Sequence, residues 1–219
     1  MRKKFFAFLG LVLLLATKAY AYDNGDFQVW NTESEEMKIN DKLKVTLEEE
    51  FRWGNDARQF FYQHYDTGII YTMSKHLNIG AGYRHVLSLQ SNDWKVENEP
   101  YVCASLSQVL KGFALESRSR LEYRHFNYKA DAGRYRNKFT AKLPWKFTAL
   151  KIQPYLSDEI FYIFGGTCQF NENRAYAGFS MDFTKNVKAE LYYLQDGVKN
   201  SKGKWIGANV LGSKIKIAF

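Results

Sequence analysis

The stretch Phe113–Phe126, FALESRSRLEYRHF, decides the fold class. In an extended strand, successive side chains point to opposite faces. One face then carries apolar, small and aromatic groups, namely Phe113, Leu115, Ser117, Ser119, Leu121, Tyr123 and His125. The other face carries a charge ladder made of Glu116, Arg118, Arg120, Glu122 and Arg124. A helix would spread these charges around its cylinder and leave no apolar stripe, so the pattern predicts a long strand.

The same alternation recurs along most of the chain and predicts eleven candidate strands. They cover residues 27–39, 43–52, 60–73, 77–90, 99–110, 113–126, 135–143, 150–164, 174–183, 187–193 and 211–219. No segment has the period of a helix. Most candidates exceed the about five or six residues of a typical strand in a soluble protein. They are long enough for the about 9–11 residues that a tilted strand needs to cross a bilayer.

The N-terminal segment has the layout of a secretory signal peptide. Residues 1–4 are basic, residues 5–16 are apolar, and Ala19-Tyr20-Ala21 is a small-x-small cleavage site. The alternative is an uncleaved anchor, but the apolar run is too short to span a bilayer comfortably as a helix. We therefore expect two parts: a cleaved signal peptide over 1–21 and a barrel domain over 22–219.

The charge of the exported chain is ordinary. Cleavage removes four basic residues and no acid, so the formal net charge falls by four from +8 to +4. This balance gives no reason to expect nucleic acid as a partner. Cys103 and Cys168 lie far apart in the sequence, and either a disulfide or two isolated thiols is compatible with export.

The breaks between the candidate strands alternate in length. Short turns are expected at 40–41, 74–75, 111–112, 148–149 and 185–186, and longer polar links at 54–58, 91–98, 127–133, 165–173 and 196–204. Outer-membrane barrels have such an asymmetry, with short periplasmic turns and longer external loops. A soluble sandwich has no reason to keep it.

The last residue strengthens this interpretation. Phe219 ends an alternating segment and shares one face with Leu211, Ile215 and Ile217. This resembles the C-terminal strand signal by which outer-membrane barrels are handed to the barrel assembly machinery. We therefore predict an all-β, up-and-down antiparallel transmembrane β-barrel of about 10–12 strands in the cell outer membrane, with membrane lipids around it.

The strand count conflicts with the even numbers of single-chain bacterial barrels. Either residues 27–39 lie in the mouth or lumen and ten strands form the wall, or one strand has been missed and there are twelve. The oligomeric state is open.

If lipid surrounds the barrel, the polar faces line its interior. Arg84, Arg136 and Arg174 then join the charge ladder of 116–124 in the lumen. Unpaired, desolvated charge is costly, so these groups must pair or stay hydrated. One hypothesis is a salt-bridged filling that keeps the barrel rigid, and the other is a small pore whose basic excess prefers anions.

Several motifs resemble one family. They are RSRLEYR at 118–124, GAGYRH at 80–85, SDEIF at 157–161, NRAYAGFS at 173–180 and Trp30-Asn31. The chain resembles an uncharacterised outer-membrane β-barrel family of the domain-of-unknown-function series in Gram-negative bacteria. The resemblance implies the barrel architecture and its location, and it carries no activity and no catalytic residues.

Two other function classes remain as alternatives. A lipid-modifying enzyme of the outer membrane would use His85 or His125 with Ser88, Ser117 or Ser119, but these serines follow no nucleophile motif. The second alternative is a soluble periplasmic β-barrel that binds a ligand, but such a protein does not need strands of this length.

The histidines and cysteines show no metal-ligand spacing, so no metal and no cofactor are expected. We expect Gly80 and Gly82 to make room for bulky neighbours in the lumen.

Overall fold

A computed structural model describes residues 25–165, 168–200 and 202–219. The expected signal peptide, residues 1–21, lies outside the described residues. The described chain contains no helix that is long and apolar enough to cross a membrane. Its eleven strands are β1 (Asp26–Lys38), β2 (Leu43–Gly54), β3 (Gln59–Thr72), β4 (Leu77–Gln90), β5 (Asp93–Leu110), β6 (Phe113–Phe126), β7 (Ala132–Lys142), β8 (Gln153–Phe164), β9 (Gln169–Asp182), β10 (Val187–Lys199) and β11 (Trp205–Ala218).

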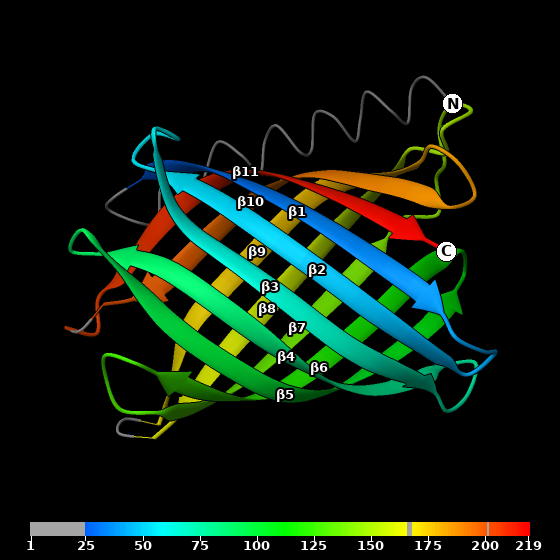
Figure 1. The fold of residues 1–219 in the computed structure, drawn as a ribbon. Helices are drawn as coiled ribbons and strands as arrows, with labels where there is room; N and C mark the ends of the chain where they lie inside the picture. Colours follow the sequence, from blue (N-terminus) through cyan, green and yellow to red (C-terminus); the bar gives the residue numbers. More distant parts are fainter. Residues whose placement is uncertain (1–24, 166–167, 201) are drawn as a thin grey trace.

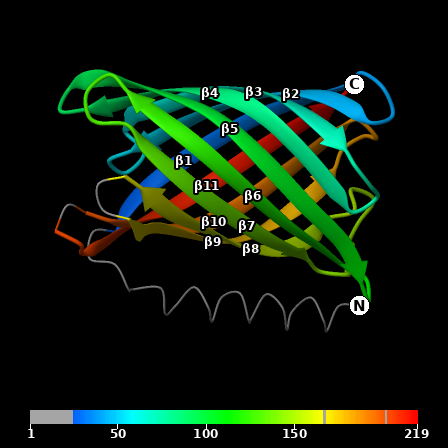
Figure 2. The same cartoon turned by 90° about the horizontal axis from the view of Figure 1, so that it is seen from below.

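The strands form one closed barrel in sequence order, and they run obliquely around it (Figures 1 and 2). Consecutive strands pair antiparallel, and β1 closes the barrel by pairing with β11 in parallel. The parallel seam follows from the odd number, because the first and last strands of an odd up-and-down series run in the same direction.

The all-β barrel of 10–12 strands is confirmed, but the expected even number is wrong. Residues 26–38 are a wall strand, and they lie neither in the mouth nor in the lumen. No twelfth strand occurs in the described chain. The parallel pairing of β1 with β11 satisfies both edges without an additional strand, so an even count is not required for closure.

Side chains alternate between the interior and the outer wall. Ion pairs identify the inner face: Glu48 in β2 reaches Lys214 in β11 at 2.6 Å and Arg84 in β4 at 3.4 Å, each time past an intervening strand. The outer face carries the apolar residues of the same strands. Leu121, Val102 and Ile69 each lie within a strand and are more than half exposed.

Two glycines make the notch that one inner tyrosine fills. Gly68 and Gly82 are register partners on β3 and β4, and the ring of Tyr101 from β5 lies over them. A Cβ added to Gly82 would lie 2.3 Å from the hydroxyl oxygen of Tyr101, and one added to Gly80 would lie 2.5 Å from Ile70 Cδ1. The expectation that Gly80 and Gly82 make room for bulky neighbours is therefore confirmed.

The predicted alternation of short and long connections is wrong. The connection over 91–92 has two residues because β5 begins at Asp93, and β9 and β10 also extend into segments expected to be loops. The long connection over 143–152 lies at the end where a tight turn was expected, and it contains a bridge between Phe147 and Ile152. The ends of these strands are rich in polar residues, because the inward face of each strand stays polar over its whole length. In the sequence such ends have the composition of a loop.

Candidate functional site: the lumen

The inner face holds a network of ion pairs centred on acids in neighbouring strands. Asp66 of β3 accepts hydrogen bonds from Arg84 Nε at 2.9 Å, Arg120 Nη1 at 3.1 Å and the hydroxyl of Tyr101 at 2.6 Å. The guanidinium of Arg120 also lies over the Tyr101 ring, 3.7 Å from its centroid. These contacts tie β3, β4, β5 and β6 together across the interior.

A second part of the network joins β5, β6 and β7. Arg134 donates hydrogen bonds to Glu122 and, at 2.6 Å, to Glu99. Arg136 Nε lies 3.3 Å from Glu122, and Arg124 pairs with Glu97. Glu99 and Glu122 are each only 1% exposed, so these carboxylates depend on the arginines for their compensation.

A cavity of about 90 Å³ remains inside the barrel beside this network. Four aromatic residues line it and belong to the buried cluster of Trp30, Tyr155, Tyr176, Tyr192, Leu194 and Val210. The cavity, which we call the chamber, is also lined by seven cations and four carboxylates: Arg52, Arg84, Arg118, Arg136, Lys138, Arg174 and Lys214, with Glu48, Glu50, Glu159 and Glu190.

The structure places all the sequence-predicted ladder residues on the inner face, but they differ in environment. Arg120 and Glu122 are buried in the network, and so are Arg84 and Arg136. Arg174 pairs with Glu172 at 2.6 Å and with Asp196 at 3.4 Å, and Arg124 pairs with Glu97. Glu116 is exposed near the start of β6, and Arg118 lines the chamber.

Sequence reasoning missed Asp66, Glu97, Glu99 and Arg134. A bulge opposite Arg52 and Trp53 leaves Phe61 without a register partner and shifts the alternation of β3, which concealed the inward phase of Asp66. Glu97 was assigned to a loop, although Glu97, Glu99 and Tyr101 alternate with the same period as the rest of β5. That period was the available signal.

The C-terminal residues lie on the outer wall. Leu211, Ile215 and Phe219 are exposed, and Ile217 is half-buried. Phe219 donates its backbone N–H to the Glu36 carbonyl at 2.9 Å, so the end of the chain is attached to β1. At the opposite end, Trp53, Phe60 and Trp94 form an aromatic group with ring centroids 5.5 Å apart in successive pairs.

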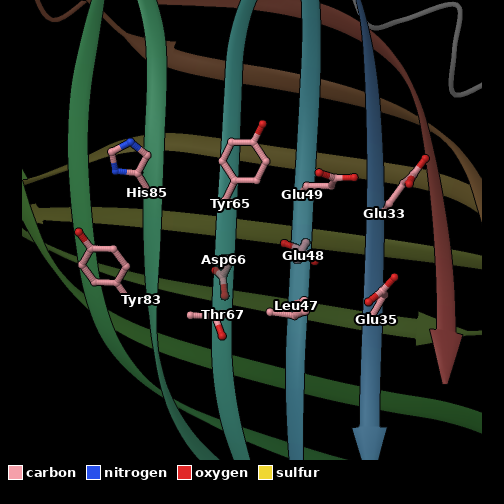
Figure 3. Close-up of a pocket in the computed structure, with 10 residues that line it drawn as sticks. All are labelled: Glu33, Glu35, Leu47, Glu48, Glu49, Tyr65, Asp66, Thr67, Tyr83 and His85. Carbon is pink, nitrogen blue, oxygen red and sulfur yellow. The ribbon is translucent and has the colours of Figure 1, made fainter. Parts of the chain in front are cut away.

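The outer wall also carries a groove of about 440 Å³ across β1–β4 (Figure 3). Glu33 and Glu49 are register partners there, and Glu35 lies two residues along β1. Like charges directly opposite each other on one sheet face destabilise the pairing. The pairing of Glu49 with Glu33 on one side and with Tyr65 on the other is regular, so no bulge separates the two acids.

The candidate catalytic histidines lie on the outer wall near one end. His85 Nδ1 is 2.9 Å from Asn98 Oδ1, and His125 Nδ1 is 3.0 Å from Asp131 Oδ1. Hydrogen bonds from Tyr123, from His125 and from the Phe126 backbone lower the pKa of Asp131, which lies in the loop after β6, to about 2.

The candidate serines have other partners. Asn137 Nδ2 donates to Ser117 at 3.0 Å and to Ser119 at 2.9 Å, and Gln90 donates to Ser88. Within the described ranges, no serine hydroxyl is among the hydrogen-bond partners of His85 or His125.

Cys103 and Cys168 are free thiols. The residues described include no group of three or more His, Cys, Asp or Glu side chains placed to hold a metal ion.

Comparison with known proteins places the chain in a family. A search of the curated proteins and a search of the solved structures found no match. A family model with the description "Protein of unknown function (DUF2490)" matches residues 27–207. This match confirms the resemblance to a family of the domain-of-unknown-function series. Because it runs from the start of β1 into β11, the chain belongs to the DUF2490 family.

Proposed function

We propose that the protein is an outer-membrane β-barrel whose lumen is closed by its own side chains, and that it serves as a rigid membrane-spanning scaffold. The observation that carries the proposal is the inner ion-pair network. Asp66, Glu99 and Glu122 each bind cations from more than one strand, and the chamber beside them measures about 90 Å³. A diffusion pore needs a continuous aqueous path, which this filling opposes.

The membrane part of the proposal is supported by the outer wall. Large apolar residues are exposed along the middle of the strands, as Leu47, Val102 and Leu121 show. The strands have 11–18 residues, so each is at least as long as the about 9–11 residues that a membrane crossing needs. The aromatic group of Trp53, Phe60 and Trp94 lies near one end, where outer-membrane barrels have an interfacial girdle.

Fractionation of cells tests the location. The mature protein is expected in the outer-membrane fraction, with gel mobility that changes on heating because a folded barrel resists detergent. Release of the protein as a freely soluble species by osmotic shock would contradict the proposal and favour a periplasmic binding protein.

Conductance in a planar bilayer tests the closed lumen. The wild-type barrel is expected to give small steps or none, because the network holds charged side chains across the interior. Large, long-lived, cation-selective steps would exclude both the closed lumen and a basic pore.

A small anion-preferring pore is the second candidate. It is favoured by the excess of cations over carboxylates around the chamber. Small steps with anion preference that shrink in Arg118→Gln and Lys138→Gln would support the pore over the closed scaffold.

The proposal assigns the barrel no catalytic step. Phospholipids and lipid A should therefore have the same profile with and without the protein. A change in that profile that is abolished by His85→Ala or His125→Ala would establish the lipid-modifying enzyme instead.

A further inference from the structure

The carboxylates of the chamber are already engaged by identified groups. Glu48 pairs with Lys214, and Glu50 pairs with Arg52 and accepts a hydrogen bond from Thr32 at 2.9 Å. The other two are held in the same way. Glu159 lies 3.6 Å from Arg136 and accepts a hydrogen bond from Tyr176, and Glu190 lies 3.3 Å from Lys142.

Arg84 pairs with Asp66, and Arg174 pairs with Glu172 and Asp196. Two of the seven chamber cations therefore remain without an ion pair in the described chain. Within the described residues, neither Arg118 nor Lys138 has a carboxylate within 4.0 Å. Lys138 Nζ instead lies over the Tyr176 ring, 3.6 Å from its centroid. The rings of Tyr155 and Tyr176 bound the same space, so the two cations face a chamber that is partly apolar.

The two cations are also register partners. Arg118 of β6 lies directly opposite Lys138 of β7, and the next inward pair along the same strands is Arg120 opposite Arg136. Directly opposed like charges destabilise a sheet, and charges removed from water need a partner. On its other side Lys138 lies opposite Glu159 of β8, so carboxylates are present around the pair, but none of those described forms an ion pair with Arg118 or Lys138 within 4.0 Å. Two successive cationic pairs thus concentrate positive charge on one part of the chamber wall, and the N–H groups of Arg118 and Lys138 are left without a bound carboxylate from the described residues.

We propose that the chamber is a binding site for a small oxyanion, with phosphate or carboxylate chemistry, held between Arg118 and Lys138. A guanidinium presents paired N–H donors that match two oxygens of such an anion, and the ammonium adds a point charge. A buried water needs about 10–15 Å³ of such a cavity, so about 90 Å³ holds an anion of a few heavy atoms with some water. The inference rests on the closed lumen proposed above, because an open channel would hydrate the same charges.

Thermal unfolding of the refolded barrel in detergent tests the site, with inorganic phosphate as the probe. Phosphate is expected to raise the melting temperature in a saturable way, beyond the effect of chloride at equal ionic strength. Arg118→Gln and Lys138→Gln are each expected to weaken the apparent phosphate affinity at least tenfold, and Lys138→Arg should retain it. Lys44→Gln is the matched control, because Lys44 pairs with Glu36 at 2.9 Å and does not line the chamber.

Titration of the wild-type barrel with phosphate tests the oxyanion site even if a variant does not fold. A phosphate effect that is absent, or no larger than that of chloride, overturns the oxyanion site. A phosphate effect that persists unchanged in both glutamine variants also overturns it. Failure of the closed lumen is distinguishable, because it appears as large conductance steps, whereas failure of the site leaves a closed barrel that ignores phosphate.

Discussion

Gly82→Ala is expected to destabilise the barrel because the added methyl group occupies the notch that Tyr101 fills. The new Cβ would lie 2.3 Å from the tyrosine hydroxyl oxygen, 2.4 Å from its Cζ and 2.5 Å from the Thr67 carbonyl oxygen. Ordinary van der Waals contact begins at 3.4 Å, so the ring must retreat by about 1 Å.

The magnitude follows from three contributions. Overpacking of a filled interior costs about 1–3 kcal/mol. Displacement of the ring breaks the 2.6 Å hydrogen bond from Tyr101 to the Asp66 carboxylate, which costs about 1.5–3 kcal/mol for a charged acceptor. Replacing glycine within a strand returns about 0.5–1 kcal/mol. The net loss in the free energy of unfolding is therefore about 2–5 kcal/mol.

Denaturant unfolding of the refolded barrel in detergent, followed by tryptophan fluorescence, measures this loss. Gly133→Ala is the matched control, because its Cβ would lie 3.4 Å from the nearest atom of Phe164. In a double-mutant cycle, Gly82→Ala should cost much less when Tyr101 is already alanine. A Gly82→Ala variant within about 0.5 kcal/mol of the wild type would refute the packing argument.

Three further perturbations test the network, the outer wall and the loop after β6. Glu122→Gln removes the carboxylate that Arg134 and Arg136 share and should cost about 3–5 kcal/mol in the same unfolding assay; a loss below about 1 kcal/mol would mean that the arginines find other partners. Glu49→Gln should stabilise the barrel by about 0.2–1 kcal/mol, because it relieves repulsion from the register partner Glu33, and a destabilised variant would contradict this. Because the folded pKa of Asp131 is depressed to about 2, its hydrogen bonds contribute stability above the unfolded pKa of about 3.9, which is lost as the pH falls through about 2. The Phe126 amide should therefore stay protected from hydrogen exchange at pH 4 and lose relative protection near pH 2, and an equal relative protection at both values would contradict the assignment.

Local alternation predicted strands well where no bulge interrupts them. Residues 113–126 form β6 as predicted, because Leu115, Leu121 and Tyr123 alternate with charges without a break. In residues 60–73 the bulge at Phe61 reverses the inward and outward alternation of the side chains, and no residue type there predicts the bulge. The ends of several strands were predicted as loops, because inward polar residues such as Glu97 continue along the strand beyond its apolar outward residues.

The partners within the lumen were beyond prediction. Arg120 and Asp66 are 54 residues apart and meet only because β4 and β5 lie between their strands in a closed wall. The parallel pairing of β1 with β11 could not be predicted from either segment alone, since it depends on the register of the two strands and not on the composition of either.

The parallel seam has a consequence for how the barrel forms. Ten pairings join strands that are consecutive in the chain, whereas the seam brings Asp26 to Ala208. Distant contacts form late because the loop entropy must be overcome first. The assembling sheet therefore exposes two unpaired edges until β1 meets β11, and its last joint has the slanted, slightly weaker bonds of a parallel pair. The topology therefore predicts that an open sheet precedes closure, and that the seam is where the finished barrel reopens first.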